Sequence, residues 1–383
     1  MVPIFVAATG RDAGKTTVSL GLLHFFRKQG LRAGFIKPVG QRYEVIDGVK
    51  VDEDSVLIKD IFGLEAPLAA MSPVAVPRGF TAEYVHHRDK FAFLTEDIRR
   101  AFGEVGRHQD VVIVEGTGHA GVGSIFDLSN ATVAHLLGAK AIIVSEGGIG
   151  SAVDEIVLNA ALFEKAGVQV IGAVVNKVLE DKYHKVKEVV TQALVERGLC
   201  PVAFLPFRTE LTSPQVQQVA HKLAAEFLCG EEHGTDYIDN VVIAGMEPQN
   251  VIPLLAPRSL VITPGDRADN ILVAVSSRLM HDPSRPQVSA ILLTHGFRPH
   301  ETIVELLRRA NIPVLLTTRD TYSVASQVYS MSVKTLSGDR EKIDIIKRMV
   351  EEHMSAECLI GTDGGCRNCG GRCAMRGLAA SSL

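Results

Sequence analysis

The sequence predicts an α/β protein in which a parallel sheet carries helices on both faces and a second, smaller α/β unit follows. Short β-branched runs alternate with helix-length segments through the first two hundred of the 383 residues. These runs are almost continuously apolar, as is typical of strands buried on both faces of a parallel sheet. The same alternation resumes after residue 240 over a shorter length, so we expect a second domain there.

The first elements expected are a strand, a loop, a helix and a second strand. The run PIFVAAT is the first strand, and the segment GKTTVSLGLLHFFRKQG is the helix. Its apolar residues Val18, Leu22, Phe25 and Phe26 recur at helical spacing, and the helix is expected to stop at Gly30. The later strands of this unit are expected in AGFIKPV, DVVIVEG, AKAIIVSE and VQVIGAVVNKV.

The second unit is expected to contain the strands NVVIAG, RSLVITPG, SAILLTHG and IPVLLTT, with helices in ADNILVAVSSRL and HETIVELLRRA between them. The polar, glycine-bearing segment LCGEEHGTDYID separates the two units. From about Ser355 the periodic pattern gives way to glycine, cysteine and arginine. We therefore expect a first domain over residues 1–227, a linker over 228–239, a second domain over 240–350 and a cysteine-rich tail over 351–383.

Composition and charge exclude several classes of function. The formal net charge is −4 at pH 7 and the sequence has no sustained basic face, so we expect no nucleic-acid partner. It has no run of about 18 uncharged apolar residues, so we expect no membrane partner. The apolar N-terminus lacks a basic region and a cleavage site, which indicates a buried strand rather than an export signal. Together these features predict a cytoplasmic protein with reduced cysteines.

The stretch ATGRDAGKTTVSLGL, residues 8–22, has the pattern of a phosphate-binding loop between a strand and a helix. Such a loop directs backbone N–H groups and the positive end of the helix at a phosphate, while a lysine reaches the outer oxygens and a hydroxyl helps to hold Mg²⁺. Thr9 replaces the first glycine of the usual pattern, and a chance Gly-Lys-Thr at a helix start is the alternative. The predicted nucleotide-binding residues of the loop are Gly10, Asp12, Gly14, Lys15, Thr16 and Thr17.

Acidic and basic residues at other predicted strand ends complete this site. Glu115 ends the strand DVVIVEG, and Asp54 belongs to the acidic stretch VDEDS. Ligands gather at the carboxyl ends of strands in open α/β sheets, and Mg²⁺ prefers carboxylate oxygens, so both are candidate metal ligands. Lys37 leaves the second strand toward the same crevice and is a candidate catalytic residue beside Lys15. The alternatives are an exposed acidic run and a lysine whose stem lies on apolar surface.

The motifs TGRDAGKTT, IKPVGQ, DEDS, VEGTG and VVNKV, in this order, resemble those of dethiobiotin synthetase-like P-loop proteins. The resemblance covers about residues 2–225 and is strongest to the N-terminal domain of long phosphotransacetylases. It implies that Lys15 and Thr16 meet phosphates and Mg²⁺, that Asp54 and Glu115 complete the metal site, and that Asn176 reads the adenine edge. It also implies that Lys37 faces a second, small-molecule substrate and that the protein is a homodimer.

The sequence departs from the synthetases beside the lysine. Gln41 and Arg42 follow KPVG where small hydroxyl residues are usual, so the nucleotide site transfers better than the substrate site. The segments LVITPGDRADNILVAVSS and AILLTHGFRPHETIVELLRRANIPVLLTTRDTYSVASQV resemble the DRTGG domain over about residues 240–345. Gly265, Asp266 and Arg267 of its namesake motif are kept. This turn is expected either to bind an anion or to cap the following helix.

Four cysteines crowd the tail in the pattern C-x7-C-x2-C-x3-C. Glycine-rich backbone allows tight turns that point several thiolates at one centre, so either a Zn²⁺ ion or an iron–sulfur cluster is expected there. The alternative is a tail whose thiols bind nothing. The predicted ligands are Cys358, Cys366, Cys369 and Cys373.

Three functions are compatible with these features. The first is a regulatory or nucleotide-sensing module that binds ATP and Mg²⁺. The second is an ATP-dependent ligase acting on a small carboxylate, amine or carbamate, with Lys15 and Lys37 stabilising charge at the transferred phosphate. The third is an ATPase linked to the cysteine-bound centre. Whether ATP is hydrolysed or only sensed stays open at this point.

Overall fold

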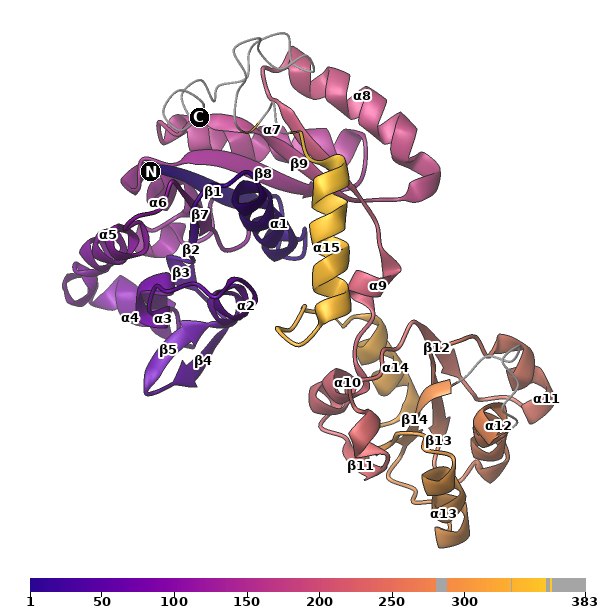
Figure 1. Ribbon diagram of the computed structural model, residues 1–383. Coiled ribbons are helices and arrows are strands. Elements are labelled where there is room, and N and C mark those ends of the chain that lie inside the picture. Colours follow the sequence, from indigo (N-terminus) through magenta and orange to yellow (C-terminus); the bar gives the residue numbers. More distant parts are fainter. Residues whose placement is uncertain (280–287, 332, 356–358, 360–383) are drawn as a thin grey trace. The chain divides into compact units, whose positions relative to one another are not determined.

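Two sheets carry the fold in a computed structural model of the chain, which describes residues 1–279, 288–331, 333–355 and 359 (Figure 1). The described chain forms two compact units. The first contains Met1–Phe207 together with the described residues from Leu336 onward, and the second contains Arg208–Thr335. Each unit is an α/β structure, which confirms the predicted fold class.

The first unit is built on a six-stranded sheet with the order β10-β9-β8-β1-β7-β2, in which every neighbouring pair is parallel. Its strands are short runs of β-branched and other apolar residues, and all five residues of β7 are buried. The hydrophobic effect favours this arrangement because helices cover both faces of the sheet. The strands are β1 (Val2–Ala8), β2 (Ala33–Ile36), β7 (Val111–Glu115), β8 (Lys140–Glu146), β9 (Val170–Val178) and β10 (Pro201–Pro206).

The helices of the first unit divide between the two faces because the chain crosses the sheet in both directions. From β1 the chain moves to β2 at one edge, whereas from β8 it moves through β9 to β10 at the other edge. Right-handed connections in opposite directions place their helices on opposite faces, so α1 lies opposite α7 and α8. The connecting helices are α1 (Lys15–Lys28), α5 (Leu94–Val105), α6 (Asn130–Leu136), α7 (Gly150–Lys165) and α8 (Tyr183–Glu196).

A long insertion separates β2 from β7 and contains a hairpin that the sequence analysis did not predict. Its strands β4 (Tyr43–Ile46) and β5 (Val49–Asp52) are antiparallel. The turn residues Asp47 and Gly48 both have positive φ, which is the conformation that Asp-Gly favours in a two-residue hairpin. The rest of the segment between β2 and β7 comprises β3 (Val39–Gly40), α2 (Glu53–Phe62), α3 (Leu68–Met71), β6 (Val74–Ala75), α4 (Phe80–His86), a 3₁₀ turn at Arg88–Phe91 and α5. A second 3₁₀ turn, Ser124–Phe126, follows β7.

The helix α15 (Arg340–His353) follows the second unit in the sequence but packs against α1 in the first (Figure 1). A Cβ added at Gly21 of α1 would overlap the side chain of Val350, so the two helices approach closely at this point. Glu351 forms a hydrogen bond with His24 at 2.6 Å and an ion pair with Lys28 at 2.8 Å, both on α1. This helix therefore completes one face of the first unit.

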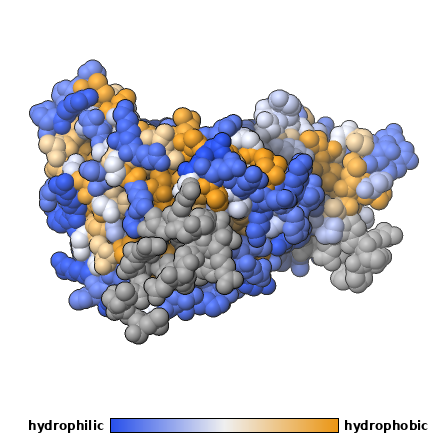
Figure 2. All heavy atoms as spheres, turned by 90° about the horizontal axis from the view of Figure 1, so that it is seen from above, coloured by the Kyte–Doolittle hydropathy of each residue, from blue (hydrophilic) through white to orange (hydrophobic). Residues whose placement is uncertain are grey.

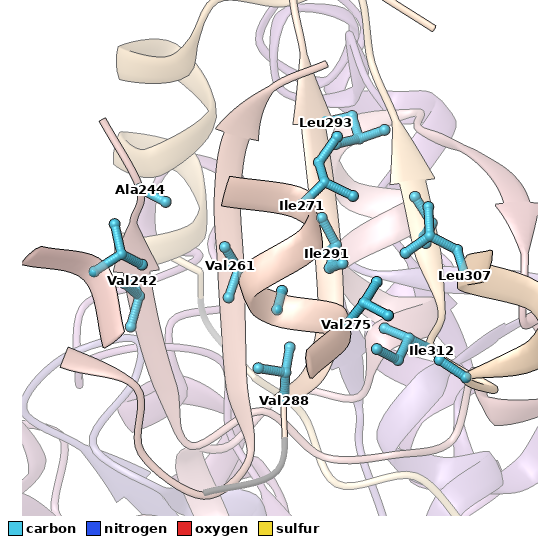
Figure 3. Close-up of a cluster of buried hydrophobic side chains, with 14 residues drawn as sticks. Val242, Ala244, Val261, Ile271, Val275, Val288, Ile291, Leu293, Leu307 and Ile312 are labelled. Atoms are coloured by element: carbon cyan, nitrogen blue, oxygen red, sulfur yellow. The ribbon is translucent and has the colours of Figure 1, made fainter. Parts of the chain in front are cut away.

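The second unit has a five-stranded sheet with the order β11-β15-β14-β13-β12, parallel except for the pairing of β11 with β15. Side chains alternate along β13, where Val261 faces one hydrophobic cluster while Leu260 and Ile262 face the other. Figure 3 shows the first cluster, in which side chains of the sheet meet those of α12 (Ala268–Leu279). The strands are β11 (Glu226–Cys229), β12 (Asn240–Ile243), β13 (Ser259–Pro264), β14 (Val288–Thr294) and β15 (Val314–Leu316).

The boundaries of the two units differ from those expected from the sequence. Val216 and Val219 of α10 pack with Leu260 and Ile262 in the second unit, so the chain changes units at residue 208 rather than in the expected linker. Strand β11 begins before that expected linker and ends within it. The helices of this unit are α9 (Thr209–Thr212), α10 (Val216–Leu223), α11 (Pro248–Val251), α12 (Ala268–Leu279), α13 (Glu301–Arg309) and α14 (Thr321–Tyr329), with three-residue 3₁₀ turns at Glu231–His233 and Ile252–Leu254.

Candidate nucleotide site

The loop between β1 and α1 ends at Gly14, whose backbone lies in the left-handed region at φ 92°. A Cβ at this position would overlap the side-chain amide of Asn176, so the loop requires glycine on both conformational and steric grounds. Within the described residues, no side chain caps the first turn of α1, and this turn contains no acidic residue. Backbone N–H groups and the positive end of the helix therefore point to an anion as the partner of this loop.

The side chain of Lys15 folds back over the loop. Its Nζ donates to the carbonyl oxygens of Gly10 and Arg11, at 3.3 and 3.2 Å. Burial lowers the pKa of Lys15, and the nearby Glu115 carboxylate partly opposes this shift. An ammonium at this place is within reach of the outer oxygens of a phosphate bound by the loop.

Thr16 and Glu115 lie together, although 99 positions separate them in the sequence. Thr16 Oγ1 donates to Glu115 Oε1 at 3.2 Å. Glu115 ends β7 next to β1 in the sheet and is completely buried, while its Oε2 has no hydrogen-bond partner among the described residues. The two residues meet because the carboxyl ends of parallel strands share one edge of the sheet, as the sequence analysis expected.

Lys37 lies in the same place, surrounded by three carboxylates. Its Nζ is 3.2 Å from Asp52 Oδ1, 3.2 Å from Glu115 Oε1 and in close contact with Asp54 Oδ2. The lysine follows β2, Asp52 ends β5, and Asp54 lies in the first turn of α2. All four side chains are buried. We call these four residues the Lys37 cluster.

The electrostatics of the Lys37 cluster follow from its burial. Removal from water opposes the charge on Lys37, but Glu115, Asp54 and Asp52 together outweigh this effect and raise the pKa of Lys37. Burial raises the pKa of Glu115, an effect that Lys37 opposes and that Asp54 reinforces. The lysine is therefore a protonated counter-ion to the carboxylates at neutral pH.

The other residues predicted to bind nucleotide border the same loop. Asn176 on β9 donates through Nδ2 to the carbonyl oxygen of Ala13, at 2.9 Å, and is buried behind the loop. The exposed Asp12 accepts through its backbone carbonyl from Lys177 Nζ at 2.6 Å. Thr17 is half-buried in the first turn of α1. The structure thus brings these residues to one edge of the sheet, and their roles toward a nucleotide stay predictions.

Two further residues shape the site: Asp52, which the sequence marks as one of the carboxylates of the acidic stretch VDEDS, and Asn130, which the sequence does not mark. Asp52 caps α2 by accepting from the backbone N–H of Asp54 at 3.0 Å, and it also contacts Lys37. Its position between a strand and a helix is the signal for this capping role. Asn130 donates to the carbonyl oxygens of Thr117 and His119, at 2.9 and 2.7 Å, which fixes the loop after β7. No comparable sequence signal marks Asn130.

The turn after β13 in the second unit carries the partly kept DRTGG motif. Gly265 approaches the backbone of Phe297 so closely that a Cβ would overlap its carbonyl oxygen. Arg267 donates to both carboxylate oxygens of Asp269, at 2.9 and 2.8 Å, and to the carbonyl oxygen of Met246 at 3.0 Å. The arginine therefore links the start of α12 to the loop after β12, which gives the motif a structural role.

The cysteine tail bears on the third function expected from the sequence. Cys358, Cys366, Cys369 and Cys373 all lie outside the described residues, so the expected Zn²⁺ ion or iron–sulfur cluster stays a prediction. Within the described part of the chain, no group of three or more His, Cys, Asp or Glu side chains is arranged to hold a metal ion by itself.

The length and apolar character of the described helices bear on whether the chain contains a membrane span. Over residues 1–279, 288–331, 333–355 and 359, none combines the length and the apolar character needed to cross a bilayer.

The surface of the described chain carries both kinds of residue. The face shown in Figure 2 mixes hydrophobic and hydrophilic residues. Val157 and Leu158 of α7 are exposed hydrophobic residues of the first unit. The homodimer expected from the sequence stays a prediction.

The glycine loop, its lysine, the threonine at the helix start and the acid at the neighbouring strand end define a P-loop protein of the nucleotide-binding class. The chain belongs to the AAA domain family, whose sequence model matches residues 3–215. A DRTGG domain follows over residues 218–331. These matches confirm the resemblance stated from the sequence, and their boundary lies close to the division between the two compact units.

Similar proteins with this arrangement are named phosphate acetyltransferases. The protein from Nitrosomonas europaea is 28% identical over 94% of this chain and 51% of its own length. The proteins from Pseudomonas putida and Nitratidesulfovibrio vulgaris are 28% and 27% identical, over 94% and 93% of this chain and 51% of their own lengths. The chain therefore spans about half the length of the curated relatives it matches.

Solved structures resemble parts of the chain more distantly. The CBS and DRTGG domains of the regulatory region of a Clostridium perfringens pyrophosphatase share 21% identity, with a TM-score of 0.26, over 36% of this chain and 59% of theirs. The MinC:MinD cell division protein complex of Aquifex aeolicus gives 14% identity and a TM-score of 0.35, over 55% of this chain and 84% of the other. Both scores are low, so neither likeness bears on the function of this chain.

Proposed function

We propose that the first unit binds ATP together with Mg²⁺ and that the chain serves as a regulatory, nucleotide-sensing module. The observation that carries this proposal is the contact between Thr16 Oγ1 and Glu115 Oε1 beside a glycine loop that Lys15 covers. A hydroxyl at a helix start and a buried strand-end carboxylate are the groups that P-loop proteins use to hold the metal of a bound nucleotide.

The residues present fit this ligand. Glu115 Oε2 is a buried oxygen without a hydrogen bond of ordinary geometry among the described residues, and only the nearby Ser19 hydroxyl acts on this carboxylate as a donor besides Thr16 and Lys37. A cation at this oxygen would offset the cost of its burial. Thr16, Asp54 and Glu115 would hold the Mg²⁺, while Lys15, Thr17 and the loop N–H groups would bind the phosphates. Mg²⁺ would neutralise phosphate charge when bound, and it needs only one or two protein carboxylates because phosphates and water fill its other positions.

A sensing role is supported by the surroundings of Lys37. In a ligase of the synthetase type, this ammonium would hold the second substrate. Here it is engaged by three carboxylates, while the following Gln41 and Arg42 are exposed. The DRTGG domain that follows the first unit is a second α/β domain that could respond to nucleotide binding in the first unit. The matched relatives are named phosphate acetyltransferases, and the chain spans about half of their length, so the sensing role is proposed from the site and not from the name of the relatives.

Isothermal titration with ATP and Mg²⁺ tests this proposal. Wild type is expected to bind one nucleotide for each chain, and Lys15→Ala to weaken binding by about a hundredfold or more because a charge-assisted phosphate contact is lost. Lys165→Ala is the matched control, since Lys165 is an exposed lysine at the end of α7. Absence of binding to the folded wild type, or equal binding by wild type and Lys15→Ala, would contradict the proposal.

A ligase activity is the second candidate, and the burial of a second lysine beside the phosphate loop favours it. Lys37 is close enough to Glu115 and Thr16 to share the nucleotide site. An ammonium there would stabilise charge between an attacking carboxylate, amine or carbamate and the transferred phosphate. Release of ADP that a metabolite stimulates in wild type but not in Lys37→Ala would support this function. Lack of stimulation across carboxylates, amines and carbamates would exclude it.

A further inference from the structure

Lys37 occupies the place that a divalent cation would take. Its Nζ contacts Asp54 Oδ2 and lies 3.2 Å from Glu115 Oε1, the oxygen that also accepts from Thr16. Mg²⁺ bridging the two carboxylates would need an oxygen of each at about 2.1 Å. A divalent cation bound by these two carboxylates would lie against an ammonium that already contacts both of them, and the repulsion between the two buried positive charges disfavours their presence together.

Moving Lys37 out of the way is unfavourable without a new partner for its charge. The side chain is 8% exposed, and its ammonium contacts the carboxylates of Glu115, Asp54 and Asp52. A buried ammonium that leaves its counter-ions loses much more than an exposed one, because water does not replace them. A divalent cation arriving alone offers Lys37 no negative group. The phosphates of a nucleotide do, since the ammonium lies beside the loop that would bind them.

We propose that Lys37 is a resident counter-ion that keeps the carboxylates closed to divalent cations until nucleotide phosphates accept its ammonium. The inference rests on the proposed function and adds its regulation: the cation and the nucleotide enter together. By linkage, the nucleotide raises the affinity for the cation by the same factor by which the cation raises the affinity for the nucleotide. The chain would then respond to the ATP–cation complex and not to a free divalent cation.

Binding of Mn²⁺ without nucleotide tests this inference, because free Mn²⁺ is measured directly by electron paramagnetic resonance. Wild type is expected to bind Mn²⁺ weakly in the first unit, and Lys37→Gln to bind it at least about tenfold more tightly because removing one adjacent charge frees the carboxylates. Lys28→Gln is the matched control, since Lys28 pairs with Glu351 at 2.8 Å at the end of α1 that is remote from the loop. This control is expected to behave as wild type.

Two measurements keep the test decisive if Lys37→Gln is unstable. The first is far-UV circular dichroism, in which the inference expects Mg²⁺ to restore the folded signal of this variant. The second is the double variant Lys37→Gln with Glu115→Gln, in which the gain in Mn²⁺ affinity should be abolished. Equal Mn²⁺ affinity in wild type and Lys37→Gln, or a destabilised Lys37→Gln that Mg²⁺ does not restore, would overturn the inference. Since these measurements use no nucleotide, their failure is distinct from a failure of ATP binding.

Discussion

Replacing Gly21 by alanine tests the packing of α15 on the helix that follows the phosphate loop. A Cβ at Gly21 would overlap Val350 Cγ2 and lie 3.0 and 3.2 Å from its Cβ and Cγ1. Val350 is completely buried. A β-branched residue in a helix has one strongly preferred rotamer, so Val350 cannot turn away and the two helices must separate.

The size of the effect follows from two opposing terms. Alanine is favoured over glycine in a helix interior by about 1 kcal/mol. Forcing an extra methyl group into a filled core costs typically about 1–3 kcal/mol, and three close contacts with a rigid side chain place this site near the upper end. We therefore expect Gly21→Ala to lower the free energy of unfolding of the first unit by about 1–2 kcal/mol.

Hydrogen exchange resolved by peptide is the suitable assay, because a chain with two units need not unfold in one step. Exchange in both α1 and α15 should quicken in Gly21→Ala. Gly103→Ala in α5 is the matched control: a Cβ there meets nothing within 4 Å, so this change should stabilise its helix by up to about 1 kcal/mol. If Gly21→Ala stabilises the protein as Gly103→Ala does, the two helices do not pack as described.

A double-mutant cycle sharpens the result. Val350→Ala removes the two methyl groups that obstruct a Cβ at Gly21, so its combination with Gly21→Ala should be less harmful than the sum of the single changes. We expect a coupling of at least about 1 kcal/mol, as is found for residues in direct contact. Additive effects would show that the helices relax apart without strain.

Four further predictions follow from the structure. Gly14→Ala should abolish nucleotide binding in titration calorimetry, because the residue combines φ 92° with a close contact behind the loop; unchanged affinity would contradict the assigned loop geometry. Gly265→Ala should destabilise the second unit by about 3 kcal/mol or more, as seen by proteolysis, because the Cβ would overlap the Phe297 carbonyl. Hydrogen bonds from Arg32 lower the pKa of Asp110 to about 2, so this carboxylate stabilises the fold above its unfolded pKa of about 4 and loses that effect as pH falls toward 2. The stability difference between wild type and Asp110→Asn, measured by urea unfolding, should therefore vanish over this pH range, and a difference that persists at the acid end would refute the pairing. Light scattering should give a homodimer, and a mass equal to one chain of 41.3 kDa would refute that expectation.

The placement of some site residues could be expected from the sequence because it is set by local pattern and by the rule for parallel strands. A strand, a glycine loop and a helix in succession place Lys15 and Thr16 at the carboxyl edge of the sheet. Glu115 ends another apolar strand, and parallel strands bring such ends to one edge. Neither step needs knowledge of contacts between particular distant side chains.

Contacts between distant segments escaped prediction because no periodicity encodes them. The charged lysine leaving β2 was expected near the phosphate loop, but its partners come from a hairpin and a helix start whose positions depend on the packing of the insertion. The turn with Gly265, Asp266 and Arg267 was expected to bind an anion or to cap the following helix, and the bridge from its arginine to the loop after β12 was not anticipated.

By itself the sequence determined the class of the fold, most strands of the two sheets and the glycine loop between β1 and α1, because these depend on hydrophobic pattern and backbone preference within short segments. Only the tertiary structure decided that α15 returns to cover α1 and that Lys37 is locked among three carboxylates. Burial brings such groups together across long stretches of chain, and their charges acquire their effect only once water is excluded.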